Sequence, residues 1–244
     1  MIIATAQFTA RPLDVGANVA RMAGFVAEAG GRGAALVVFG ELAVTGYELD
    51  AVAADPGRLA LAPGDPRLAP VRDACRAAGV AAVVNCAGRT AQGPTISSFV
   101  YGPDGALLTR YDKVHVTDGE RAAGFVAGTQ DGRFTLDGTA FGLAICFDAH
   151  FPDLAERAVA DGCRVLVASS LYGRGPGQAE RREIFPALAK DNGLHVLLAN
   201  HVGAAGPYDA CGLSAVWGPD GAELAVAGET EAGLVVAAVA DVLV

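Results

Sequence analysis

Cys146 is the residue whose type and position most strongly suggest covalent chemistry. It follows the apolar run Gly142-Leu-Ala-Ile and precedes Phe147 and Asp148. Ligands bind at the carboxyl ends of strands in α/β sheets, so a cysteine in this position is placed for nucleophilic attack. Many buried cysteines only pack. The remaining four cysteines lack this strand-end position and are predicted to be packing residues: Cys75, Cys86, Cys163 and Cys211.

Charged residues elsewhere in the chain have the properties that such a cysteine needs. A thiol is only a few per cent ionised at pH 7 and requires a base or a cationic neighbour. Glu41 follows the apolar run Ala35–Phe39, where desolvation would raise its proton affinity, as a general base requires. Lys113 follows Leu107–Asp112 and would stabilise a thiolate and an oxyanion. Glu120 is expected to hold Lys113 or to contact the substrate. Each has an ordinary alternative as a solvated residue.

Composition limits the class of protein. Residues 1–244 are enough for one large domain, and we expect a single domain with one active site. The chain is 52% hydrophobic and 18% charged, which is too apolar for disorder. No run of about 18 apolar residues is free of breaks, so no membrane association is expected. The net charge of −9 argues against nucleic acid as a partner.

The cysteines and the first residues of the chain suggest a cellular location. Five scattered cysteines without a CxxC pair argue against a disulfide framework and against a zinc site. The start, MIIATAQFTA, has no basic leader and is predicted to be a strand. We therefore expect a cytoplasmic protein with reduced cysteines.

Apolar runs of strand length alternate with helical segments, which is typical of an α/β fold. Gly30, Gly79 and Gly193 are predicted to end helices in a left-handed conformation, and Ala53–Asp65 and Gly173–Gly177 are predicted to be loops. Helices are predicted over Val15–Ala29, Pro66–Ala77, Pro152–Ala160 and Gln178–Asn192. Strands are predicted over Ile2–Phe8, Ala35–Phe39, Val80–Cys86, Ile96–Tyr101, Phe141–Phe147, Arg164–Ala168, Leu194–Asn200, Leu213–Trp217 and Leu234–Val239.

One segment occurs twice. FVYGPDGALL at 99–108 is similar to AVWGPDGAEL at 215–224. In each copy Pro-Asp-Gly supplies the fixed φ, the side-chain acceptor and the positive-φ residue of a tight turn, so each is predicted to be a β-hairpin. Two hairpins can converge on one turn independently, or the chain has two structurally similar halves, each with its own sheet. These residues alone leave both possibilities open.

Four separated segments resemble one known family. FGELAVTGY (39–47), RYDKVH (110–115), GLAICFDAHFPD (142–153) and LANHVG (198–203) occur in the order found in the nitrilase superfamily of carbon–nitrogen hydrolases, and GLSAVWGPDG (212–221) is similar to the family's final hairpin. The resemblance implies an α/β fold, a four-layer α-β-β-α sandwich with two mixed sheets and internal pseudo-symmetry. It implies a triad of Glu41, Lys113 and Cys146 and a second glutamate, for which Glu120 is best placed.

The sequence departs from the family pattern at three places. The family usually has Pro before the first catalytic glutamate, where this chain has Gly40, which could loosen the turn. The helix segment 187–192 is ALAKDN where the family commonly shows Arg-Ala-x-Glu-Asn, which affects local packing. His150 stands where several branches acting on carboxylate-bearing substrates carry Arg, so a carboxylate anchor is not supported.

The expected reaction is hydrolysis of a small linear amide through a thioester on Cys146. An amidase is favoured over a true nitrilase, because nitrilases typically follow the nucleophile with Trp-Glu, whereas Phe147 and Asp148 follow it here. N-carbamoyl (ureido) hydrolysis needs the same catalytic groups and stays open. We expect no metal or organic cofactor, and the resemblance implies a homodimer or a higher homo-oligomer. The predicted substrate-binding residues are Tyr47, Phe147, His150, Ser170 and Leu171, the last two within Ser169–Tyr172.

Two alternatives belong to other classes. A Cys–His thiol enzyme would pair Cys146 with a histidine, and a catalytically silent homologue would bind a small molecule on the same fold. The first predicts that a His→Ala change abolishes activity while Glu41→Gln is mild. The candidate histidines are His115, His150, His195 and His201.

Overall fold

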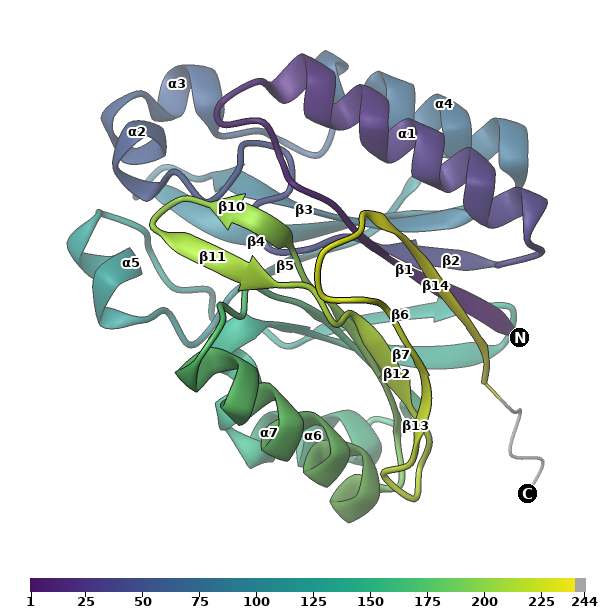
Figure 1. Cartoon of the computed structure of the whole chain (residues 1–244). Coiled ribbons are helices and arrows are strands. Elements are labelled where there is room, and N and C mark those ends of the chain that lie inside the picture. The colour runs from purple at the N-terminus through teal and green to yellow at the C-terminus, as the bar shows by residue number, and fades with distance from the viewer. Residues whose placement is uncertain (240–244) are drawn as a thin grey trace.

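The computed structural model describes residues 1–239 and places two six-stranded sheets face to face, with helices on both outer sides (Figure 1). Helices α1 and α4 cover the first sheet, and α6 and α7 cover the second. The predicted four-layer α-β-β-α sandwich is therefore confirmed. Across the middle, the Thr5 hydroxyl in the first sheet donates to the Leu198 carbonyl in the second at 3.0 Å.

The first sheet has the order β14-β1-β2-β3-β4-β5. β1 pairs antiparallel with β14 and parallel with β2; β2 pairs parallel with β3; β3, β4 and β5 follow antiparallel. Its central strands are almost fully buried, as their continuous apolar sequence predicts. The bounds are β1 Ile2–Gln7, β2 Leu36–Val38, β3 Ala81–Arg89, β4 Pro94–Tyr101, β5 Leu107–Asp112 and β14 Gly233–Ala238.

The second sheet repeats this arrangement in the order β6-β7-β8-β9-β12-β13. β7, β8 and β9 are parallel, and the other pairs are antiparallel. A separate two-stranded hairpin of β10 and β11 lies beside the sandwich. The bounds are β6 Gly132–Leu136, β7 Thr139–Ile145, β8 Val165–Ser169, β9 His195–Ala199, β10 Val202–Ala205, β11 Tyr208–Cys211, β12 Ala215–Trp217 and β13 Glu223–Val226.

Several helix ends follow the local chemistry that the sequence indicates. The Asp14 side chain accepts from the Ala17 N–H at 3.0 Å and caps α1. Gly79 and Gly193, with φ of 66° and 63°, end α4 and α7 as predicted. The bounds are α1 Val15–Gly31, α2 Leu49–Ala54, α3 Pro56–Leu59, α4 Ala69–Ala78, α5 Asp118–Ala122, α6 Pro152–Ala160 and α7 Pro176–Asn192, with 3₁₀ turns at Pro66–Leu68 and Cys146–His150. Within residues 1–239 no helix has both the length and the apolar character that a bilayer crossing requires.

The two Pro-Asp-Gly segments are equivalent hairpins, one at the edge of each sheet. Gly105 and Gly221 have φ of 71° and 81°, and the side chains of Asp104 and Asp220 each accept an N–H two residues further on. Both hairpins have a register shift at the same point of the repeat, at Val100/Tyr101 and Val216/Trp217. Together with the matching strand orders, this confirms the internal pseudo-symmetry.

Several predicted elements need correction. Gly30 does not end α1; it lies inside the helix, where an added Cβ would be 2.9 Å from the Cβ of Ala78, so the glycine permits close packing of α1 on α4. The predicted loop Ala53–Asp65 contains α3, and α7 begins at Pro176, inside the predicted loop Gly173–Gly177. The sequence did not predict the short or polar elements β6, β10, β11, α2, α3 and α5.

Candidate active site

Cys146 is the first residue of the 3₁₀ turn after β7, not part of the predicted strand Phe141–Phe147. The strand stops because Cys146 has a φ of 45°, a left-handed conformation that extended backbone cannot continue. The residue is partly exposed, and its thiol donates to the Leu171 carbonyl at 3.6 Å. The sharp turn presents the sulfur at the carboxyl end of the second sheet.

Lys113 lies fully buried between two carboxylates. Its Nζ donates to Oε1 of Glu41 at 2.7 Å and to Oε1 of Glu120 at 2.6 Å. The Tyr47 hydroxyl donates to the same Glu120 oxygen at 2.8 Å, and the Thr117 N–H donates to the other at 2.8 Å. Oε2 of Glu41 is buried without a hydrogen-bond partner within residues 1–239. This oxygen is free to accept a proton.

Burial and charge tune the three groups differently. Burial, opposed by Lys113, raises the pKa of Glu41 to about 7. Burial opposes the charge on Lys113, but Glu41, Cys146 and Glu120 outweigh it and hold the lysine pKa above its ordinary value. Burial and the charge of Glu41 raise the pKa of the Cys146 thiol well above its ordinary value, while Lys113 lowers it. The site therefore combines a neutral thiol, a permanent cation and a carboxyl that titrates near neutrality.

Backbone contacts from both sheets fix the Glu41 loop after β2. The Glu41 N–H donates to the Ser170 carbonyl at 3.2 Å, and the next N–H, of Leu42, donates to Oδ1 of Asn85 at 2.7 Å. Nε2 of His201 lies 2.5 Å from the Glu41 carbonyl oxygen. Gly40 is in contact with the same imidazole: an added Cβ would lie 2.9 Å from its Cδ2. Gly40 therefore permits close packing of this loop on the imidazole, and the loosening of the turn stays a prediction.

A buried carboxylate, that of Asp148, connects the cysteine turn to the lysine segment. Its Oδ2 accepts from the Ile145 N–H at 2.9 Å and from the Tyr111 hydroxyl at 2.6 Å. Its Oδ1 lies 2.9 Å from both the backbone N and the ring Nδ1 of His115. The sequence presented Asp148 only as a turn residue behind the cysteine.

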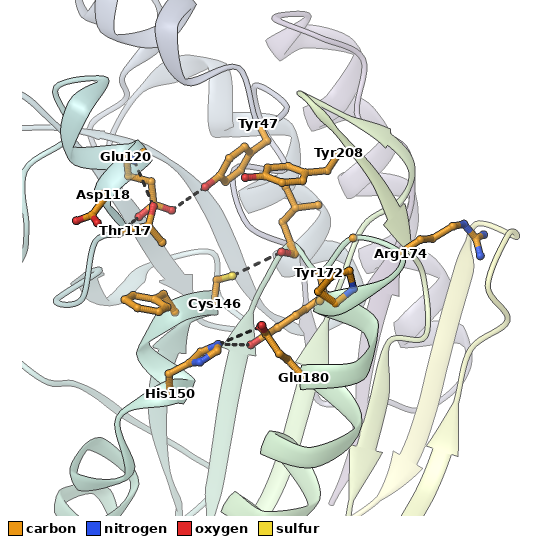
Figure 2. A pocket seen from close by; sticks show the side chains of 16 residues that line it. Tyr47, Thr117, Asp118, Glu120, Cys146, His150, Tyr172, Arg174, Glu180 and Tyr208 are labelled. Carbon is orange, nitrogen blue, oxygen red and sulfur yellow. Dashed lines mark hydrogen bonds and ion pairs between the residues drawn. The ribbon is translucent and has the colours of Figure 1, made fainter.

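A cavity of about 830 Å³ opens in front of Cys146, and Figure 2 shows the thiol directed toward the carbonyl contact at its floor. Glu41, Lys113 and Ser170 do not line it. The side chains of Glu41 and Lys113 are fully buried, and the Ser170 carbonyl accepts from the Glu41 N–H. The predicted site residues that do line the cavity are Tyr47, Glu120, Cys146, Phe147, His150 and Leu171.

Other residues of the cavity wall escaped prediction from sequence. Tyr208 comes from β11, whose short polar strand was not predicted. Glu180 comes from the first turns of α7, and its side chain lies 3.8 Å from His150 (Figure 2). Solvated charges of this kind carry no distinguishing pattern in a sequence. The wall also includes Thr117, Asp118 and Arg174, and Tyr172, which belongs to the predicted segment Ser169–Tyr172.

The histidines have other partners. Within residues 1–239 no hydrogen bond joins the Cys146 thiol to an imidazole, and His195 is buried as a packed residue of β9. The charges that shift the pKa of the Cys146 thiol come from Glu41, Lys113 and Glu120, which favours the carboxylate and lysine over a Cys–His pair. The same residues contain no group of three or more His, Cys, Asp or Glu arranged to hold a metal ion. The polar partners are Asp148 for His115, Glu180 and Tyr172 for His150, and the Glu41 carbonyl for His201.

Two comparisons with protein sequences agree with this geometry. The family model described as Carbon-nitrogen hydrolase matches residues 2–243. A Pseudomonas protegens protein named "Hydrolase in pqqF 5'region" is 30% identical over 95% of this chain and 80% of its own length. Human omega-amidase NIT2 is 32% identical over a shorter stretch, 54% of this chain and 51% of that enzyme.

Solved structures with the same fold include an amidase from Nesterenkonia sp. AN1, with a TM-score of 0.90 and 29% identity over 99% of this chain and 93% of that one. A variant of that amidase in complex with butyramide has a TM-score of 0.88 and 29% identity over 97% and 90% of the two chains. Another variant carries acrylamide, added at its active-site cysteine. The resemblance found in the sequence is confirmed, and this chain belongs to the carbon–nitrogen hydrolase family, within the nitrilase superfamily.

Proposed function

We propose that the protein hydrolyses small linear amides to a carboxylic acid and ammonia or an amine, with Cys146 as nucleophile, Glu41 as proton carrier and Lys113 as the cation at the oxyanion. The observation that carries the proposal is the buried lysine bound to Glu41 and Glu120, whose charge acts on the thiol of Cys146, a residue that lines the cavity. Glu120, tied to Tyr47 and Thr117, holds Lys113 in place.

The first half-reaction forms a thioester. Glu41 takes the proton of the Cys146 thiol as the sulfur bonds to the carbonyl carbon, and the C=O electron pair moves onto the oxygen. The Lys113 ammonium and the Phe147 N–H stabilise this oxyanion. Glu41 then gives its proton to the amide nitrogen as the C–N bond breaks and ammonia or an amine leaves.

The second half-reaction regenerates the thiol. Glu41 takes a proton from water as the oxygen attacks the thioester carbonyl, and the second oxyanion meets the same two donors. The C–S bond breaks, the acid leaves, and Glu41 returns the proton to the sulfur. A carboxyl with a pKa of about 7 suits both directions of transfer.

The substrate class is supported by similarity. The Nesterenkonia amidase has been described with butyramide, with acrylamide and with the acetamide moiety of fluoroacetamide on its active-site cysteine, and all three are small amides. The cavity of about 830 Å³ is large enough for such molecules. A panel of aliphatic amides, ureido acids and nitriles, assayed for ammonia release, will define the preferred group.

Replacing the nucleophile tests the proposal. We expect Cys146→Ala to lose essentially all turnover, because the remaining groups cannot form the thioester. Cys163→Ala, at a buried cysteine outside the site, is the matched control and should retain turnover. A covalent adduct of wild-type protein with an amide, found by mass spectrometry on Cys146, would add direct support. Undiminished ammonia release by Cys146→Ala would refute the mechanism.

A further inference from the structure

We propose that Asp148 is a positioning residue that fixes the distance and angle between the Cys146 thiol and the Lys113 ammonium. This inference rests on the proposed function, since it assigns the two groups to one reaction. Asp148 is fully buried and lies outside the cavity wall, so it acts through the residues it binds and not on the substrate.

The hydrogen bonds of Asp148 join the two parts of the site. Ile145, whose N–H it accepts at 2.9 Å, immediately precedes Cys146 in the second half of the chain. Tyr111 and His115, bound at 2.6 Å and 2.9 Å, stand two residues before and two residues after Lys113. One carboxylate therefore binds the chain on both sides of the lysine and directly beside the cysteine.

The backbone of Cys146 explains why such a contact is needed. A residue other than glycine with a φ of 45° is strained and keeps that conformation only when its surroundings impose it. Asp148 lies two residues after Cys146 and accepts a hydrogen bond from the N–H of Ile145, the residue before Cys146. This hydrogen bond spans the turn and holds Cys146 in its conformation. His115 is itself held by a parallel stack on Phe151, with ring centroids 3.6 Å apart.

Loss of these bonds should separate the two reacting groups without changing the cavity wall. A misplacement of about 1 Å can lower a rate by about 10². In Asp148→Asn an NH₂ group replaces one carboxylate oxygen and faces a donor that it cannot bind. We therefore expect this variant to lower kcat by about 10² with KM little changed. Tyr111→Phe, which removes one donor and leaves the carboxylate with three, should lower kcat by less.

The experiment compares these variants with a matched control. Tyr101 is a buried tyrosine of the same sheet whose hydroxyl donates to the Pro63 carbonyl at 2.7 Å, so Tyr101→Phe removes an equivalent hydrogen bond away from the site. For each folded variant, kcat and KM are measured with one amide, and the rate of Cys146 alkylation by iodoacetamide is measured against pH. Cys146→Ala is the blank for alkylation at other cysteines.

The expected result is that Asp148→Asn and Tyr111→Phe lower kcat and move the alkylation profile to higher pH, because Lys113 no longer favours the thiolate, while Tyr101→Phe changes only thermal stability. Wild-type kcat and an unchanged profile in both site variants would overturn the inference. If Asp148→Asn does not fold, Tyr111→Phe gives the answer alone. Hydrolysis by Cys146→Ala would instead overturn the proposed function, and the alkylation profile, which needs no substrate, still decides the role of Asp148.

Discussion

The two halves of the molecule have the same architecture. One half is the first sheet with α1 and α4, and the other is the second sheet with α6 and α7. Their strand pairings follow the same order, and each ends in the same bulged Pro-Asp-Gly hairpin. An asparagine does the same work in each: Oδ1 of Asn85 accepts from the Leu42 N–H at 2.7 Å, and Oδ1 of Asn200 accepts from the Tyr172 N–H at 2.8 Å.

The loops that these asparagines hold differ in what they offer. The loop of the first half presents the Glu41 carboxylate, and Lys113 follows β5 in the same half. The loop of the second half presents backbone carbonyls, of Ser170 to Glu41 and of Leu171 to the Cys146 thiol. The comparison teaches that equivalent hydrogen bonds to the backbone support the site in both halves, while the side chains they position differ: the charges of Glu41 and Lys113 come from one half and the Cys146 thiol from the other.

The largest expected effect comes from removing the cation of the first half. We expect Lys113→Met to lower kcat by about 10²–10³, the typical cost of an oxyanion donor. It should also destabilise the protein by about 3–5 kcal/mol, because two buried carboxylates lose their shared partner. The chain's other lysine, Lys190, is exposed on α7 in the second half, so Lys190→Met is the matched control. Equal kcat values for the two variants would contradict the division between the halves.

An intermediate effect is expected in the pH dependence of kcat/KM. Because burial raises the pKa of Glu41 to about 7 and the base form takes the thiol proton, kcat/KM should rise about tenfold per pH unit below pH 7 and level off above it. The negative charge of Glu120 contributes to that pKa, so Glu120→Gln should move the limb to lower pH.

The matched control for this profile is Glu229→Gln, at an exposed carboxylate of the second half that binds Arg174. It should leave the limb in place. A wild-type midpoint near 4.5, the ordinary value for glutamate, would show that Glu41 is not the titrating base.

The smallest effects should come from the paired asparagines. Asn200 binds Tyr172 through both backbone groups and also donates to the Gly212 carbonyl, whereas the Asn85 side chain binds the Leu42 N–H and the Ser98 hydroxyl and no other group within residues 1–239. Each unsatisfied buried group costs about 1–3 kcal/mol. Asn200→Ala should therefore lower the free energy of unfolding more than Asn85→Ala, as measured by urea denaturation. A larger loss of unfolding free energy in Asn85→Ala than in Asn200→Ala would show that stability does not follow the number of these hydrogen bonds.

The sequence was sufficient for the architecture and for most of the candidate site residues, for identifiable reasons. Continuous apolar runs revealed the central strands, and Gly79 and Gly193 revealed helix ends because few residues tolerate positive φ. Glu41, Lys113 and Cys146 stood out because each lies at or near the carboxyl end of a predicted strand. In the structure Lys113 binds Glu41 at 2.7 Å, and the charges of both residues act on the Cys146 thiol. Glu120 was expected to hold Lys113 or to contact the substrate, and the family resemblance implied a second glutamate at this place; it binds Lys113 at 2.6 Å.

What the sequence could not supply depends on contacts between distant segments. Asp148 looks like any turn aspartate until its donors, Tyr111 and His115, are brought to it by packing of the two sheets. Glu180 joins the cavity wall only because α7 packs beside the cysteine turn. The sequence did not predict that β7 ends before Cys146. The strand ends because Cys146 has a left-handed conformation, and hydrophobic periodicity does not report the backbone angles of a single residue.

The contact between Gly40 and His201 restricts which substitutions these two positions can accept during evolution. A methyl group at position 40 would lie 2.9 Å from Cδ2 and 3.0 Å from Nε2 of the imidazole, which itself lies against the Glu41 carbonyl. A larger residue at position 40 is thus compatible with the loop only after the ring at 201 has shrunk or turned away. The two positions form an epistatic pair, in which the order of substitutions decides whether an evolutionary path passes through an active protein.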